Sequence, residues 1–134
     1  MAPRILVVER DRSNLELIRE ILNPLGGEPI RATSVALGLF LAHKNMPDLI
    51  LSEVSLAEGD GFDLIRAVKA DPELVGIPFV FVCSDSRDDS LRTKGLALGA
   101  EKFLFHPLPS QELLDQIRPY LRERRQERAA ESPE

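Results

Sequence analysis

Several reactive side chains stand where short apolar runs end. Glu53 follows the run LILS and precedes a loop closed by Gly61. A carboxylate in this place can be a nucleophile, a metal ligand or the remnant of either. Glu9 and Arg10 follow the run ILVV, and His106 follows FLF. The candidate residues that follow the apolar runs are Glu9, Arg10, Asp11, Glu53, Cys83, Ser84 and His106.

The apolar runs have the length and composition of strands that are buried on both faces of a sheet. Amphipathic patterns that predict helices lie between the runs and after the last one. The predicted strands are residues 5–8, 29–32, 49–52, 79–82 and 103–105.

Capping and proline signals predict where some of these elements begin and end. Ser13 and Glu16 stand three apart, as in a capping box that opens the first helix. Pro29 cannot donate a ladder hydrogen bond, so the second strand should lie at a sheet edge. Pro119 lacks the amide hydrogen that would bond Asp115 and should kink the last helix or end it early.

Strands that alternate with helices predict right-handed crossovers and a mostly parallel sheet covered on both faces. The fold class is therefore α/β, doubly wound, with five strands and five helices. In such sheets the functional residues gather at the carboxyl ends of the strands. Because the candidate residues all follow predicted strands, we expect them to meet at one edge of the sheet.

Composition limits the classes of function. The chain has 134 residues and a net charge of −5, which argues against generic nucleic-acid binding. No apolar run is long enough to span a bilayer and no signal segment opens the chain, so we expect a cytoplasmic protein without membrane contact. Cys83 is the one cysteine and lies in an apolar run, which favours a buried structural side chain.

Four stretches in order resemble the receiver domain of bacterial two-component response regulators: ILVVERD, PDLILSEV, EGDGFDLIRAVKADP and LGAEKFLFHPL. The resemblance covers roughly residues 3–122. It implies a flavodoxin-like sheet with strand order 2-1-3-4-5. We expect a receiver-like domain over residues 1–125 and a disordered tail over residues 126–134.

The resemblance implies a phosphoacceptor aspartate, a magnesium ion held by acidic side chains, and a hydroxyl and a lysine that contact the phosphate. Glu53 falls on the phosphoacceptor position, where its extra methylene displaces the carboxylate. Glu9 keeps the first acidic position, but Arg10 replaces the second, and a guanidinium cannot ligate a cation. His106 replaces the lysine and is mostly neutral at pH 7. We expect the metal site to be lost and Arg10 to bridge to Glu53 or Glu9 instead.

Two further positions follow from the resemblance. The hydroxyl position is Cys83 when counted from Glu53 and Ser84 when counted back from Gly99, and we favour Ser84 on chemistry. Phe103 matches the aromatic residue that, in the family, swings between inward and outward rotamers during activation.

These departures favour a pseudo-receiver, which binds a protein partner without a phosphorylation cycle, needs no cofactor and is not an enzyme. The alternative is a working phosphoacceptor that uses Glu53 with a divalent metal such as magnesium. A flavodoxin-like small-molecule module is a third class, but the loop ERDRSN lacks the glycines that would wrap a phosphate.

In the family, the face made by the fourth helix, fifth strand and fifth helix commonly docks partners or forms a homodimer. Here that face corresponds to about residues 91–121. Its expected cations are Lys94, Lys102, Arg118 and Arg122, which would suit an acidic protein partner.

Overall fold

The computed structural model describes residues 2–84 and 86–131. Five parallel strands form one sheet in the order β2-β1-β3-β4-β5, which confirms the predicted fold class and strand order. The strands are β1 (Ile5–Val8), β2 (Ile30–Ala32), β3 (Leu49–Ser52), β4 (Phe79–Cys83) and β5 (Lys102–Phe105). The helices are α1 (Arg12–Leu22), α2 (Val35–Asn45), α3 (Gly61–Ala70), α4 (Asp89–Ala97) and α5 (Ser110–Glu131), with a 3₁₀ turn at Asn23–Leu25.

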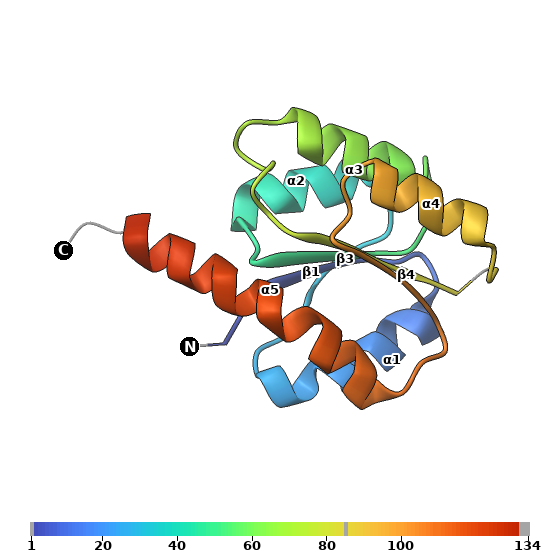
Figure 1. Cartoon of the computed structure of the whole chain (residues 1–134), viewed down its shortest axis with the longest axis horizontal. Coiled ribbons are helices and arrows are strands. Elements are labelled where there is room, and N and C mark those ends of the chain that lie inside the picture. The colour runs from blue at the N-terminus through green and yellow to red at the C-terminus, as the bar shows by residue number, and fades with distance from the viewer. Residues whose placement is uncertain (1, 85, 132–134) are drawn as a thin grey trace.

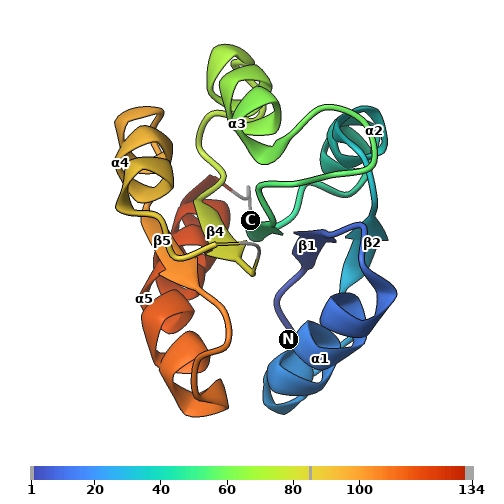
Figure 2. The same ribbon diagram turned by 90° about the vertical axis from the view of Figure 1, so that its right-hand side faces the viewer.

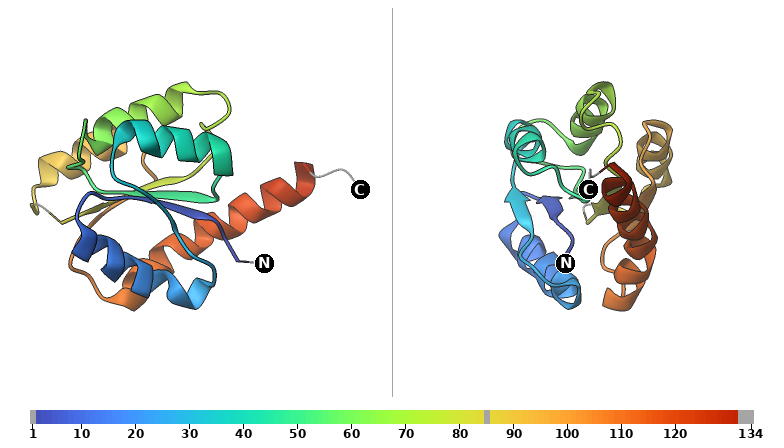
Figure 3. Two further views of the ribbon diagram at one scale, coloured as in Figure 1. Left: turned by 180° about the vertical axis from the view of Figure 1, so that it is seen from behind. Right: turned by 90° about the vertical axis from the view of Figure 1, so that its left-hand side faces the viewer.

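The helices form two layers around the sheet. Figures 1 and 2 show α1 and α5 on one face and α2, α3 and α4 on the other, and Figure 3 shows the same layers from behind and from the opposite end. Each layer has its own apolar core because side chains alternate along every strand. In β4, Phe79, Phe81 and Cys83 pack on the α2–α4 side, whereas Val80 and Val82 pack on the α1–α5 side.

The first helix begins two residues earlier than the capping box at Ser13 would place it. Asp11 is the N-cap, and its carboxylate accepts a hydrogen bond from the backbone N–H of Asn14 at 3.0 Å. The sequence prediction was wrong here because an aspartate stood directly after the loop and capped the helix first. This start places Asn14 in the first turn of α1, beside the carboxyl edge of the sheet.

Pro119 lies inside the last helix, so of the two predicted outcomes, a kink or an early end, the early end is wrong. Ile117 and Leu121 flank Pro119 and are both buried in the α1–α5 core, so packing holds the helix across the missing hydrogen bond. The helix continues to Glu131 and projects past the sheet (Figure 1). Residues 126–131 are therefore helical, where a disordered tail was expected, and residues 132–134 lie outside the described part of the chain.

Candidate functional site

Four candidate residues stand in a row at the carboxyl edge of the sheet. Val8 pairs with Ser52 across β1 and β3, so the next residues, Glu9 and Glu53, are neighbours. On the other side of β3, Ser84 follows β4 and His106 follows β5. Glu9 and Glu53 are buried, with 3% and 4% of their surface exposed. The topology therefore gathers these residues as the strand pattern predicted.

The Glu53 carboxylate is fully engaged by hydrogen bonds from the chain itself. Its Oε1 accepts from the backbone N–H of Val54 at 2.8 Å. Its Oε2 accepts from the backbone N–H of Ser84 at 2.9 Å and from the Ser84 hydroxyl at 2.6 Å. Both oxygens of the buried Glu53 carboxylate thus accept hydrogen bonds from the chain.

The hydroxyl that reaches Glu53 belongs to Ser84 and not to Cys83. Cys83 lies on the α2–α4 side of the sheet and its thiol contacts the backbone oxygen of Ser86 at 3.6 Å. Ser84 is the next residue, so its side chain points to the α1–α5 side, where Glu53 lies. Strand alternation therefore decides between the two positions that sequence counting left open.

Asn14 joins the site from α1 and was missed by the sequence analysis. Its side-chain amide donates to the Ser84 hydroxyl at 3.1 Å, and that hydroxyl in turn donates to Glu53. The result is a chain of hydrogen bonds that runs from Asn14 through Ser84 to Glu53. The feature of the sequence that could have predicted its place is the Asp11 cap, which puts Asn14 in the first turn of α1.

Glu9 is the site residue whose pKa is shifted. Burial raises its pKa from 4.5 to about 7, and the nearby charge of Glu53 adds to the rise. Hydrogen bonds from the backbone N–H of Asp11, the Asn14 side chain and the backbone of Arg10 oppose it. Near pH 7 the Glu9 carboxyl is therefore close to half protonated, which reduces its repulsion of Glu53.

Arg10 does not bridge to either glutamate, so that expectation was wrong. It is exposed and forms no ion pair with any other residue that the structure describes. Glu9 is buried at the end of β1, whereas Arg10 is exposed at the bend between β1 and α1. Ser84 and the backbone N–H of Val54, rather than Arg10, donate to the Glu53 carboxylate.

His106 lies at the same edge but makes no hydrogen bond to Glu53 among the described residues. Its backbone N–H donates to the carbonyl of Cys83 at 2.8 Å, and its peptide bond to Pro107 is cis. Its ring Nδ1 is buried and has no partner in residues 2–84 and 86–131. The family's cationic contact at this position is thus replaced by a ring nitrogen that points into the protein.

Phe103 occupies the inward position beneath α4, with 3% of its surface exposed. Its ring lies 5.1 Å from that of Phe81 and 5.4 Å from that of Phe105, measured between centroids. A methyl group on Gly95 would come within 2.7 Å of the Phe103 ring, so the glycine makes room for it. Phe103, which the resemblance implied as a switch residue, is therefore packed in the core on the α2–α4 side of the sheet.

The acidic side chains at this edge are fewer than the family pattern has, and Glu9 and Glu53 are the two carboxylates that could hold a divalent metal. Within the described residues, no group of three or more histidine, cysteine, aspartate or glutamate side chains gathers to hold a metal ion. Both oxygens of Glu53 already accept hydrogen bonds, and the second acidic position is the outward Arg10. A hard cation needs six or more oxygen ligands, or several waters in place of some of them.

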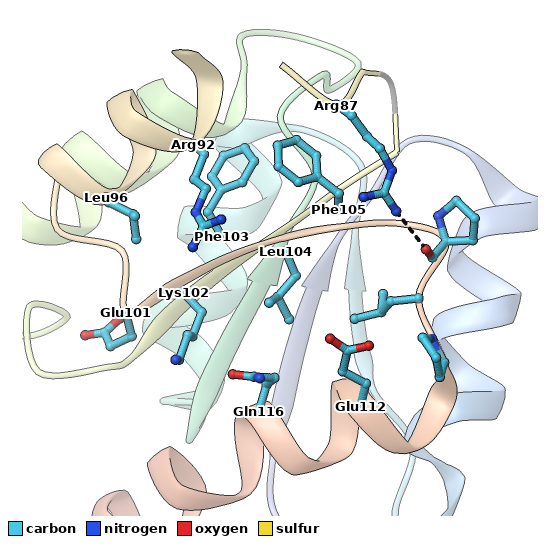
Figure 4. Close-up of a pocket in the computed structure, with 13 residues that line it drawn as sticks. Arg87, Arg92, Leu96, Glu101, Lys102, Phe103, Leu104, Phe105, Glu112 and Gln116 are labelled. Atoms are coloured by element: carbon cyan, nitrogen blue, oxygen red, sulfur yellow. Dashed lines mark hydrogen bonds between the residues drawn. The ribbon is translucent and has the colours of Figure 1, made fainter. Parts of the chain in front are cut away.

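A cavity of about 530 Å³, which we name the β5 groove, lies between α4, β5 and α5 (Figure 4). It occupies the face on which the resemblance places partner binding. Residues that line it include Arg87, Arg92, Leu96, Lys102, Leu104 and Glu112.

Only one of the four cations expected on this face lies in the groove. Lys102 lines it, whereas Lys94 sits over the Phe62 ring at 4.5 Å. Arg118 and Arg122 line a separate cavity beside Pro24 and Leu25. Arg87 and Arg92, which the sequence analysis did not single out, supply the other positive charges of the groove.

Comparison with known proteins agrees with this architecture. The response regulator receiver domain family matches residues 5–118. The polar-differentiation response regulator DivK of Brucella ovis is 30% identical over 123 residues, which cover 90% of this chain and 98% of DivK. Within the described residues, no helix is long and apolar enough to cross a membrane.

Solved structures with the same fold extend the comparison. The signal receiver domain of a signal transduction histidine kinase from Syntrophus aciditrophicus superposes with a TM-score of 0.81 at 27% identity, covering 91% of this chain and 92% of that one. The chemotaxis response regulator CheY4 of Vibrio cholerae, at 22% identity, shares the fold with a TM-score of 0.79 over 90% of this chain and 99% of that one. With its sheet order, its row of residues at the carboxyl edge and its match over residues 5–118, the chain belongs to the response regulator receiver domain family.

Proposed function

We propose that this receiver acts as a pseudo-receiver in two-component signalling, which works in the cytoplasm by protein contact and without a phosphorylation cycle. The observation that carries the proposal is the closed set of hydrogen bonds around Glu53. The carboxylate that would have to attack a phosphoryl donor is buried, and both of its oxygens are occupied.

Phosphorylation of Glu53 would require these contacts to break. The hydroxyl and backbone N–H of Ser84 are the donors available to an incoming phosphoryl oxygen, and Glu53 already uses both. A reaction of this kind also depends on close alignment of the attacking oxygen, and a displacement of about 1 Å costs about a hundredfold in rate. We therefore infer that the Glu53 carboxylate is a fixed structural anion.

The same pocket supports a function without magnesium. At pH 7 part of the Glu9 population is neutral, so the pocket reduces its excess negative charge by taking up a proton. Arg10 contributes a positive charge at the rim where the family has a carboxylate. A proton and local hydrogen bonds thus take over the charge compensation that a divalent cation provides in the family.

The contact surface that we propose is the α4–β5–α5 face. It carries the β5 groove, where exposed Arg87 and Arg92 and half-buried Lys102 stand around apolar side chains. Phe103 is packed inward below α4, against Phe81. Such a surface suits a partner that binds without a phosphorylation signal.

The proposal is tested by incubating the chain with acetyl phosphate and Mg²⁺ and recording intact mass. We expect no phosphoryl adduct on the native chain. A triple variant, Arg10→Asp, Glu53→Asp and His106→Lys, restores the acidic and lysine positions of the family pattern and is expected to take up one phosphoryl group. An adduct on Glu53 of the native chain would support the working phosphoacceptor instead.

A further inference from the structure

The outer edge of β5 has backbone groups that face away from the sheet. β5 is the last strand in the sheet order, and its only strand neighbour in the described chain is β4. The N–H of Glu101 donates to the carbonyl of Phe79 on the β4 side. Within the strand, Lys102 pairs with Val80 and the N–H of His106 donates to the carbonyl of Cys83, so the backbone groups of Lys102 and Leu104 face β4. Because successive residues of a strand present their backbone groups to opposite sides, those of Phe103 and Phe105 point outward.

These outward groups open into the β5 groove. All four residues of β5 line the cavity, so the strand edge is its floor (Figure 4). The two sides of the floor differ. Phe103 and Phe105 face α4, where Arg87 and Arg92 stand, whereas Leu104 packs toward the α5 side. A strand laid along this edge would meet Arg87 and Arg92 on one side. On the other side it would meet Leu104 and Leu108, with the polar side chains of Lys102, Glu112 and Gln116 around them.

The charges in the groove are largely unneutralised. Arg92 and Lys102 form no ion pair with another residue of the described chain, and Arg87 contacts only the Pro107 carbonyl and the Phe105 ring. Of the two carboxylates that line the groove, Glu101 is already paired with Lys69 at 3.5 Å. In a chain of net charge −5, this face therefore presents a local excess of positive charge.

We propose that an extended segment of a partner protein, with acidic and apolar residues in alternation, pairs with the outer edge of β5 as a sixth strand. This inference rests on the proposed function, since it identifies the kind of partner that the α4–β5–α5 face binds. The acidic side chains face Arg87 and Arg92, and the apolar side chains cover Leu104. Main-chain hydrogen bonds to Phe103 and Phe105 supply affinity, and the alternation supplies specificity.

A second copy of this chain fits the edge less well. Pairing two β5 edges would bring Lys102, Arg87 and Arg92 of one copy against the same cations of the other, and like charges across a strand pair repel. The opposite edge of the sheet is also a poorer acceptor. β2 has three residues and follows Pro29, which has no N–H to donate.

The test uses a fluorescently labelled octapeptide of alternating glutamate and valine, with a lysine–valine octapeptide of the same length as the charge control. We expect the glutamate peptide to bind at least tenfold more tightly. We also expect its binding to slow amide hydrogen exchange at Phe103 and Phe105 at least tenfold, as measured by NMR. Pairing through side chains alone would leave both amides unprotected.

Two sets of variants sharpen the result. The double substitution Arg87→Glu and Arg92→Glu should reverse the preference between the two peptides, whereas Lys44→Glu on α2 should leave it unchanged; unaltered thermal unfolding checks the fold of each variant. A second test uses glutamate–valine peptides that are N-methylated on the glutamates only or on the valines only. Their affinities should differ, because only one of the two sets of N–H groups faces β5. One methylated peptide should lose binding and the other retain it.

Three results would overturn the inference. They are no binding of the glutamate peptide, equal binding of the two peptides, and binding without protection of the Phe103 and Phe105 amides. None of them depends on the phosphodonor assay, which alone tests whether Glu53 is inert. If charge reversal at Arg87 and Arg92 changes binding while the amides stay unprotected, strand addition is rejected and the α4–β5–α5 face remains a contact surface.

Discussion

The acidic pocket around Glu53 at the carboxyl edge of the sheet and the β5 groove differ in one respect. The polar side chains of the pocket have hydrogen-bond partners within the chain, and the cations of the groove do not all have a charged partner among the residues that the structure describes. In the pocket, Glu53, Ser84 and Asn14 are joined by direct hydrogen bonds. In the groove, Arg92 and Lys102 have no charged partner within the described chain. The pocket is closed by the chain itself, and the groove still has groups that an incoming molecule can satisfy.

This difference indicates where substitutions should act. A buried polar group that loses its partner costs free energy of folding, whereas an exposed group contributes little to stability. We therefore expect substitutions in the pocket to change the free energy of unfolding. Substitutions in the groove should change binding and leave stability almost intact. The following predictions test this division.

The largest effect is expected at Gly61, which packs against the backbone that carries Glu53. A methyl group on Gly61 would collide with the carbonyl oxygen of Glu53 and lie 2.7 Å from the Phe81 ring. Because the clash is with backbone and a buried ring, Gly61→Ala should lower the free energy of unfolding by about 3 kcal/mol. Urea denaturation measures this value. Gly76→Ala, where the added methyl would meet only the end of Arg124 at 3.6 Å, is the control.

The next effect concerns Glu9 and depends on pH. Its pKa is about 7 in the folded chain and near 4.5 when unfolded, so between these values the folded state holds more protons. The stability of the native chain should therefore fall as pH rises from about 4.5 to about 7. Glu9→Gln cannot ionise, so at pH 8 it should be more stable than the native chain by about 2 to 3 kcal/mol.

Denaturation of both chains at pH 4, 6 and 8 checks the Glu9 prediction. Below pH 4.5 the two should be nearly equal, because the native Glu9 is then neutral in both the folded and the unfolded state. Glu58→Gln, at an exposed loop position, should follow the native curve within about 0.5 kcal/mol. A native chain that gains stability between pH 5 and pH 7 relative to Glu9→Gln would contradict the assignment.

Ser84 should have an intermediate effect. Ser84→Ala removes the hydroxyl that donates to Glu53 and accepts from Asn14, while the backbone N–H of residue 84 still donates to Glu53. One lost charge-assisted hydrogen bond and one unpaired amide correspond to about 1 to 2 kcal/mol. Chemical denaturation measures the loss. Ser86→Ala, at an exposed position two residues along the chain, should change stability by less than about 0.5 kcal/mol.

The fold was predictable because its main signals are independent of tertiary context. Apolar runs in alternation with amphipathic helices led to the sheet and, with the family resemblance, to its strand order. Two local signals misled the prediction, since Asp11 capped α1 before Ser13 could, and α5 continued through Pro119. In both cases a neighbouring cap or buried contacts outweighed the local preference of one residue.

The site was predictable where it follows strand order and not where it depends on side-chain direction. Glu9 and Glu53 were placed together correctly because adjacent parallel strands end at the same edge. Arg10 was misplaced because it is exposed at the bend between β1 and α1, past the end of the strand. Asn14 was missed because it is 70 residues from Ser84 in the sequence, and no local pattern links the two. The groove cations Arg87 and Arg92 depend on how α4 is rotated against β5, which spacing alone does not fix.

The smallest effect on stability is expected in the groove, at Arg92. Its guanidinium is exposed and forms no ion pair with another described residue, so Arg92→Ala removes no partner and leaves no buried group unsatisfied. The free energy of unfolding should change by less than about 0.5 kcal/mol, while binding of the glutamate–valine octapeptide should weaken severalfold. Urea denaturation and fluorescence anisotropy on the same preparation measure the two quantities. A loss of stability as large as that of Ser84→Ala would mean that Arg92 belongs to a structural network like the one around Glu53, and the contrast between the two regions would fail.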